Sequence, residues 1–221
     1  MKLLFTIIII LTVIGTVTTE TAKSQEENTR DLKSIPPAIE SEVRAALHFF
    51  PELEDVPIEF EFKKKIKHTT MQAQPKLSSL FKRRDNRAYI IKIAQKVKIE
   101  GDVFYTKNLP RDVMIGWIGH ELGHIMDYQE YSNLGMMWFG IRYVLSDNYI
   151  SEAERAADVY AVEQGMADFI IKTKEFILNH ANISEEYKMR VKKYYLSPEE
   201  ILMLAKGENV EEIKESLANG S

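Results

Sequence analysis

The chain has 221 residues, of which 45% are hydrophobic and 28% are charged, as in an ordinary globular domain. Its formal net charge of -4 at pH 7 offers no overall attraction for nucleic acid or anionic lipid. Because there is no cysteine, thiol catalysis, thiolate metal sites and disulfide bonds are excluded, and stability must come from a packed core.

The N-terminus has the pattern of a secretory signal peptide. Met1-Lys2 is a short basic start, and residues 3–17 form an apolar run that is shorter than the ~20 residues of a membrane span. Ala22 and Ser24 are small residues at the positions that a signal peptidase requires. We therefore predict a signal peptide at residues 1–24 and a protein that is secreted or held in the periplasm or cell envelope. An uncleaved signal anchor is the alternative.

The folded part is predicted to begin with a helix. Residues 25–37 are polar and end in two prolines, which predicts a flexible lead-in to a single domain at residues 38–221. Apolar residues between Ala38 and Phe50 recur at helical spacing, and Pro51 would end that helix.

Alternating and β-branched segments then predict a small sheet. Residues 58–68 alternate between apolar and charged side chains, as in a half-buried strand, and residues 88–94 resemble a more central strand. Residues 69–87 between them are predicted to form a loop. Residues 96–100 and 103–106 predict a further hairpin.

After Pro110 the pattern becomes helical. Pro110 favours the first turn of a helix that runs from Arg111 to about Tyr131. A second apolar helix is predicted at 134–146, and residues 151–181 hold one or two more. The predicted fold class is α+β, with an N-terminal helix and a small mixed sheet followed by a mostly helical part.

The first of these helices carries the motif H-E-x-x-H. Residues four apart share one helix face, so His120 and His124 can direct ring nitrogens to one metal ion at about 2.0–2.1 Å. Glu121 would lie beside the open coordination position, where a carboxylate can accept a proton from metal-bound water. The motif therefore predicts two ligands and a general base.

A third ligand is predicted from the E-x-x-A-D sequence further along the chain. Glu154 would complete a set of two histidines and one glutamate, which leaves the fourth position of a zinc ion for water. Asp158, one helical turn later, could accept the free ring N–H of a ligand histidine and fix its tautomer.

A structural interpretation of Glu154 stays open beside this one. Ser151 and Glu154 also fit a capping box, in which the glutamate only stabilises a helix start. If the helix begins instead at Ser146 or Asp147, Glu154 lies in its interior. Glu152 is the alternative ligand.

The two motifs, HELGH at 120–124 and ERAAD at 154–158, resemble the gluzincin group of zinc metallopeptidases. The likeness is to small members with a minimal catalytic core and, distantly, to the CAAX prenyl endopeptidase family, and it covers residues 111–165. It implies a zincin-like fold in which the edge strand before the active-site helix holds an extended peptide. It also implies one Zn2+ ion and the following site residues: His120, His124 and Glu154 as ligands, Glu121 as general base, and Asp158 as the hydrogen-bond partner of a ligand histidine.

Other residues have two interpretations each. Tyr143, Tyr149 and Tyr160 are candidates to stabilise an oxyanion, although each is more often an ordinary packing aromatic. The basic segment 82–87 is predicted to be solvated loop charge. Three glycines of the motif helix form one stripe that predicts close packing of a neighbouring element: Gly116, Gly119 and Gly123.

The leading hypothesis is an exported zinc-dependent peptidase that acts on peptide or protein substrates and has no nucleic-acid partner. Unlike its membrane-embedded relatives, the chain has no long apolar run beyond the N-terminal one, which leaves open only a peripheral contact with a membrane. The oligomeric state is not predicted. The alternative is a zinc-stabilised envelope module without catalysis, which would bind another protein through the helix at 134–146.

Overall fold

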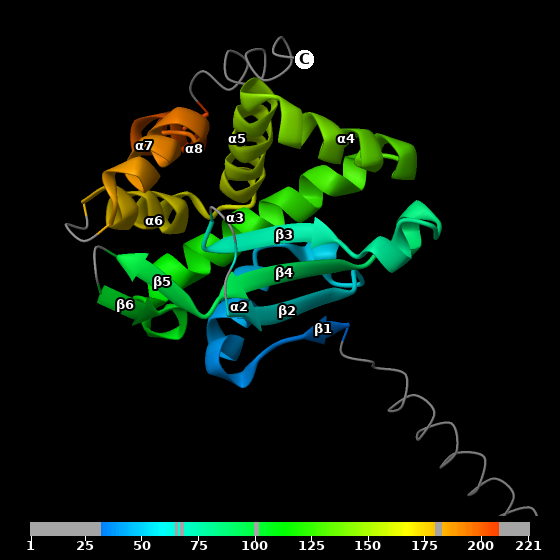
Figure 1. Cartoon of the computed structure of the whole chain (residues 1–221), viewed down its shortest axis with the longest axis horizontal. Helices are drawn as coiled ribbons and strands as arrows, with labels where there is room; N and C mark the ends of the chain where they lie inside the picture. The colour runs from blue at the N-terminus through cyan, green and yellow to red at the C-terminus, as the bar shows by residue number, and fades with distance from the viewer. Residues whose placement is uncertain (1–31, 65, 67–68, 100–101, 180–182, 208–221) are drawn as a thin grey trace, which may run out of the picture. The chain divides into compact units, whose positions relative to one another are not determined.

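A four-stranded sheet forms one side of the fold, and its order places the predicted central strand between two neighbours (Figure 1). β2 pairs in parallel with both β1 and β4, whereas β3 pairs antiparallel to β4. The order is β1-β2-β4-β3. The strands are β1 (Lys33–Ser34), β2 (Ile58–Lys63), β3 (Met71–Pro75) and β4 (Tyr89–Ala94). The computed structural model describes residues 32–64, 66, 69–99, 102–179 and 183–207.

The alternation of apolar and charged residues in β2 makes it a half-buried strand, as predicted. Ile58 and Phe60 are buried in the core, while Glu59 and Glu61 are only partly covered. In β4, Ile91 and Ile93 are fully buried, as expected for a strand with a partner on each side. The predicted hairpin is also present, as β5 (Lys96–Ile99) and β6 (Asp102–Tyr105), which pair antiparallel.

The predicted loop at 69–87 is wrong in one part, because it contains β3. Met71 and Ala73 are buried and alternate with two glutamines, which is a short strand pattern. Pro75 argues against a strand in sequence, but it is tolerated here because β3 lies at the edge of the sheet and ends at that residue.

Part of the predicted flexible lead-in also belongs to the sheet. Lys33 pairs with Ile58 across the first two strands. Its ammonium group donates hydrogen bonds to three backbone carbonyls, those of Leu53, Glu54 and Val56, at 2.7, 2.9 and 2.5 Å. The compact unit therefore begins at Lys33, earlier than the predicted start of the domain. The predicted signal peptide lies outside the described residues.

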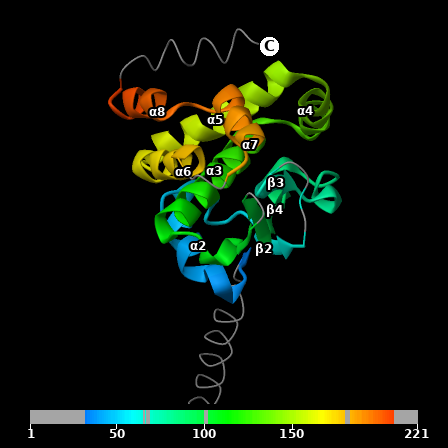
Figure 2. The ribbon, with the colours of Figure 1, turned by 60° about the vertical axis from the view of Figure 1, so that its left-hand side comes forward.

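The motif helix, α3, occupies the centre of the fold between the sheet and the other helices (Figure 1, Figure 2). α2, α5, α6 and β3 all pack against it, and 15 of its residues are buried. Its bounds confirm the predicted helix, and α4 confirms the predicted second one. None of the described helices is both long and apolar enough to span a membrane. The helices are α2 (Glu40–Leu47), α3 (Arg111–Glu130), α4 (Asn133–Leu145), α5 (Asp147–Glu163), α6 (Ala167–Asn179), α7 (Glu185–Tyr194) and α8 (Pro198–Ala205).

The glycine stripe of α3 is where its neighbours approach most closely. A Cβ atom on Gly116 would lie 2.2 Å from the carbonyl oxygen of Phe169, at the start of α6. A Cβ atom on Gly123 would lie 2.2 Å from the carbonyl oxygen of Ala157 on α5. The predicted close packing is confirmed, and the absent side chains let two helices meet the backbone of the motif helix.

The C-terminal end of α3 is held by a buried arginine. Arg87 is only 2% exposed and donates hydrogen bonds to the carbonyls of Tyr128 and Tyr131 and to the side chain of Asn133, at 2.7, 2.9 and 2.7 Å. The Tyr128 carbonyl accepts only one long backbone hydrogen bond, of 3.4 Å from Tyr131 N–H, and the negative end of the helix dipole favours a cation there. The prediction of solvated charge at 82–87 is therefore wrong for Arg87.

Replacing Arg87 by Met is expected to lower the free energy of unfolding by about 2–4 kcal/mol, because three acceptors lose a hydrogen bond from its guanidinium group. Urea denaturation of the variant and of the unaltered chain measures the difference. Arg84→Met, at an exposed position of the same segment, is the control and should stay within about 0.5 kcal/mol. Equal losses in the two variants would contradict a capping role for Arg87.

Candidate metal centre

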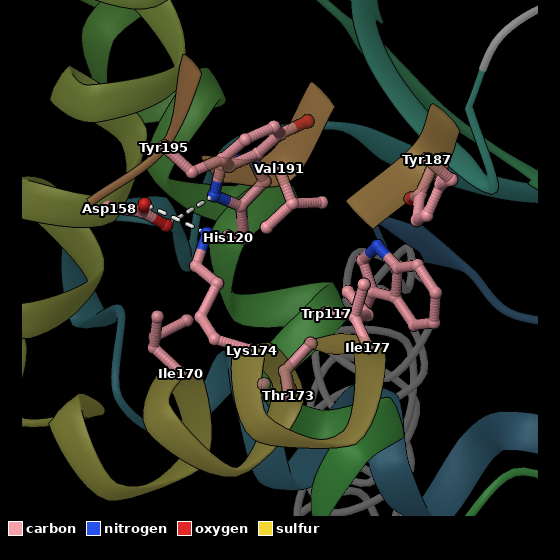
Figure 3. A pocket seen from close by; sticks show the side chains of 11 residues that line it. Trp117, His120, Asp158, Ile170, Thr173, Lys174, Ile177, Tyr187, Val191 and Tyr195 are labelled. Atoms are coloured by element: carbon pink, nitrogen blue, oxygen red, sulfur yellow. Dashed lines mark hydrogen bonds and ion pairs between the residues drawn. The ribbon is translucent and has the colours of Figure 1, made fainter. Parts of the chain in front are cut away.

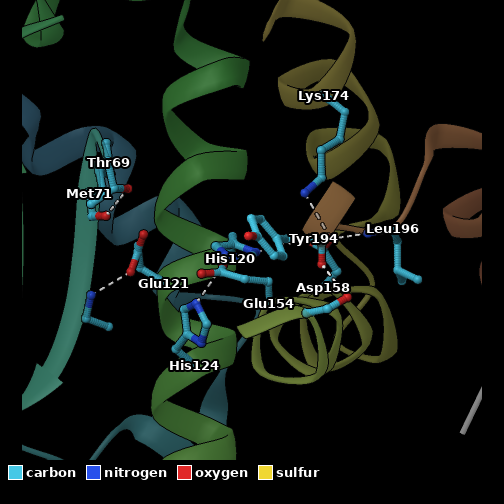
Figure 4. Close-up of polar contacts among 12 residues, drawn as sticks. Thr69, Met71, His120, Glu121, His124, Glu154, Asp158, Lys174, Tyr194 and Leu196 are labelled. Carbon is cyan, nitrogen blue, oxygen red and sulfur yellow. Dashed lines mark hydrogen bonds and ion pairs between the residues drawn. The ribbon is translucent and has the colours of Figure 1, made fainter. Parts of the chain in front are cut away.

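Two histidines of α3 and one glutamate of α5 meet at a single point in the core (Figure 4). One carboxylate oxygen of Glu154, Oε2, lies 3.1 Å from Nε2 of His120 and 3.3 Å from Nε2 of His124. The three ligand atoms lie within 4.8 Å of one another, and the three residues are only 4–6% exposed. They lie close enough together to hold a metal ion.

Two imidazole nitrogens and a carboxylate oxygen are a donor set that several divalent metal ions accept. Bonds of about 2.0–2.1 Å in a tetrahedral arrangement place neighbouring ligand atoms about 3.3–3.4 Å apart. The two distances from Glu154 Oε2 to the ring nitrogens are close to that value. Two imidazoles and one carboxylate are also a donor set of catalytic zinc sites, in which the fourth position is open.

The beginning of α5 decides between the two interpretations of Glu154. The hydroxyl oxygen of Ser146 accepts a hydrogen bond from the backbone N–H of Tyr149 and caps the helix. Glu154 therefore lies in the helix interior, and the capping-box interpretation with Ser151 is wrong. Glu152, the alternative ligand, is not part of the cluster of ligand atoms.

Asp158 lies behind His120, where the spacing along α5 predicts it. Its Oδ1 is 2.8 Å from Nδ1 of His120, while its Oδ2 accepts hydrogen bonds from Lys174 at 2.9 Å and from the backbone N–H of Leu196 at 3.1 Å. This contact leaves Nε2 of His120 free to face Glu154. The carboxylate is fully buried, yet three donors satisfy it.

These contacts set the charges of the cluster. Burial by itself lowers the pKa of His120, but the neighbouring Asp158 carboxylate and the hydrogen bonds to Asp158 and Glu154 raise it to about 9. Burial opposes ionisation of Glu154, but the hydrogen bonds and charges of the two histidines hold its pKa well below the ordinary value. The pKa of Asp158 is lowered in the same way, with Lys174 as the largest opposing influence. A metal ion would take the place of the proton between His120 and Glu154.

The predicted base, Glu121, contacts the sheet and is not part of the cluster of the three predicted ligands. Its Oε2 accepts a hydrogen bond of 2.6 Å from the backbone N–H of Ala73 in β3 (Figure 4). Burial raises the pKa of Glu121, and the charges of His124 and His120 oppose that rise. A raised pKa brings a carboxylate closer to the range in which it can both accept and return a proton.

Of the three candidate tyrosines, only Tyr143 contacts a ligand. Its hydroxyl donates a hydrogen bond of 2.6 Å to Oε1 of Glu154, the oxygen that does not face the histidines. Burial and the Glu154 charge raise the pKa of Tyr143, which keeps it a neutral donor. The guanidinium carbon of Arg142 instead lies over the ring of Tyr149, 4.2 Å from the centroid of that ring. Tyr160 is half-buried on α5.

A small cavity of about 20 Å³ lies beside His120, between α3, α6 and α7 (Figure 3). Much of its wall is apolar or aromatic, with Trp117, Ile177, Val191 and Tyr187 among the lining residues. The cavity also reaches the pair formed by Asp158 and Lys174. The cavity has room for about one water molecule next to the face of α3 that carries His120.

Sequence reasoning missed three residues of this site. Lys174 is 4% exposed and lies 4.0 Å from the ring centroid of Tyr195, whose ring in turn lies 5.3 Å from that of His120. The apolar stripe of α6 contained a signal for Lys174, because the lysine shares a face with Ile170 and Ile177. Tyr187 and Tyr195 carry no such signal.

Comparisons of the chain with protein-family models, curated proteins and solved structures found no match.

Proposed function

We propose that this chain is a zinc-dependent peptidase that hydrolyses peptide bonds with Glu121 as general base. The proposal rests on one observation: two buried glutamates near the histidines make different contacts. Glu154 faces two imidazoles, whereas Glu121, one residue after the first histidine, is held by β3 and takes no part in the ligand cluster. A purely structural metal site has no need of a second buried carboxylate beside it.

His120, His124 and Glu154 would hold a zinc ion, which would supply an acidified water and polarise a carbonyl group. Glu121 accepts a proton from the attacking water and returns it to the leaving nitrogen, as one group can do in both directions. The Ala73 N–H orients the Glu121 carboxylate. Tyr143 fixes the Glu154 carboxylate, and Asp158 fixes the ring of His120.

The edge strand β3 is suited to bind an extended peptide. It pairs with β4 on one side, and the Ala73 N–H on its other edge reaches Glu121. An extended segment can add to such an edge through main-chain hydrogen bonds at positions other than Ala73, whose N–H and C=O already contact Glu121 and Tyr128. This is the binding mode that the resemblance to gluzincins implies.

Metal removal tests this proposal. The purified full chain is expected to contain about one zinc ion per molecule and to cleave members of a mixed-peptide library. A chelator should abolish cleavage, and added zinc should restore it. Elemental analysis and mass spectrometry of the cleaved peptides give the two readouts. A chain that binds zinc in stoichiometric amount but leaves every peptide of the library intact would contradict the proposal.

A further inference from the structure

α4 presents a large apolar face to solvent. Five of its residues are exposed by 47–79%, although all are apolar. Their spacing of three or four residues places them on one side of the helix, and the opposite side is buried through Met136 and Phe139. The exposed residues are Leu134, Met137, Trp138, Ile141 and Leu145.

A second exposed apolar segment adjoins the start of this helix. Leu77 and Phe81 are 74% and 90% exposed, and they precede the buried Arg87 in the connection from β3 to β4. The side chain of Asn133, the first residue of α4, donates a hydrogen bond of 2.6 Å to the carbonyl of Lys82. We define the α4 surface as the five exposed residues of α4 together with Leu77 and Phe81. Both of its segments lie on the same side of the ribbon (Figure 1, Figure 2).

Positive charge borders the α4 surface. Lys82, Arg83 and Arg84 are consecutive and exposed, and Asp85 is the one acid of that segment. The pair Arg83–Asp85 is wide, at 3.8 Å, and solvent-exposed, so it neutralises little of this charge. α4 itself contains no Asp or Glu, whereas the whole chain carries a net charge of -4. The charge next to the apolar face is therefore opposite in sign to that of the molecule.

We propose that the α4 surface docks on an anionic lipid membrane. Apolar side chains with a tryptophan and a phenylalanine enter the boundary between headgroups and acyl chains, and the three basic residues contact anionic headgroups. α4 is about 20 Å long, so it is shorter than the ~30 Å hydrocarbon core and lies in the membrane plane. This contact is independent of the metal centre and of peptidase activity.

A native fluorophore makes the proposal testable in the full chain. The protein has two tryptophans, of which Trp117 is buried and Trp138 lies in the α4 surface. On addition of vesicles of phosphatidylcholine and phosphatidylglycerol at low salt, Trp138 emission should shift to shorter wavelength, and brominated lipid should quench it. Trp138→Phe removes both responses. The N-terminal apolar run is present in every sample, so sedimentation with vesicles is not the readout.

Two sets of variants separate the apolar and the electrostatic contributions. Leu134→Glu with Met137→Glu should abolish the shift, while Met189→Glu with Leu202→Glu, at exposed apolar positions of α7 and α8, should leave it unchanged. Replacing Lys82, Arg83 and Arg84 by Gln should weaken vesicle affinity about fivefold per charge at low salt. An unchanged Trp138 spectrum, or a shift that needs no vesicles and grows with protein concentration, would overturn the proposal. The second outcome would assign the α4 surface to a contact with another copy of the chain.

Discussion

Glu121→Gln is expected to lower kcat/KM for peptide cleavage by two to four orders of magnitude, because the amide cannot accept the proton of the attacking water. Zinc content should stay the same, since the two histidines and Glu154 form the ligand cluster without Glu121. The amide can also face the Ala73 N–H through its oxygen, so the fold should be retained. Initial rates on a peptide selected from the library, with elemental analysis of the same samples, measure both quantities.

Glu130→Gln is the control for this substitution, because it makes the same chemical change at an exposed position of the same helix. Its rate should equal that of the unaltered chain. If neither the unaltered chain nor Glu121→Gln cleaves any peptide while His120→Ala unfolds the domain, the metal centre is structural. The alternative of a zinc-stabilised module without catalysis would then hold.

Gly123→Ala is expected to lower the free energy of unfolding, because the added methyl group meets the backbone of α5. The new Cβ would lie 2.2 Å from the Ala157 carbonyl oxygen and within 3.2 Å of its Cα, so backbone rather than a flexible side chain would have to move. Overpacking of this kind costs about 1–3 kcal/mol. Ala157 lies between Glu154 and Asp158 in the chain, so the displaced segment is the one that supplies the third ligand. Zinc affinity should fall together with the free energy of unfolding.

Gly140→Ala is the matched control, because it adds the same methyl group to a helix at a position with nothing within 4 Å. It should raise stability by up to about 1 kcal/mol through helix propensity. Urea denaturation and a competitive zinc titration of the two variants give the comparison. If Gly123→Ala retained both stability and zinc affinity, α3 and α5 would have to tolerate a wider separation than the structure shows.

Local periodicity predicted the parts of the fold that are locally determined. The position of the histidines on one helix face followed from their spacing of four. The bounds of α3 followed from Pro110 and the apolar pattern, and the centrality of β4 followed from its β-branched residues on both faces. Each of these features is set by the preference of a residue for a backbone conformation or for burial, which a single sequence carries.

Other features depend on contacts between distant residues and could not be predicted in this way. Arg87 appears in the sequence as one more residue of a basic loop, and only the end of α3 beside it explains its burial. β3 could be identified as a strand only from its pairing with β4. The role of Glu154 depended on which serine caps α5, and two serines fitted equally well until the structure showed Ser146 in that position.

The covering of α3 on all sides also has a consequence for motion. Because the sheet and three helices enclose it, its backbone amides can exchange with deuterated water only when much of the domain opens. Both imidazoles are thus attached to a segment that we expect to open rarely. A metal ion that coordinates them would also join α3 to α5, so its escape would depend on rare collective openings rather than on the fraying of a helix end.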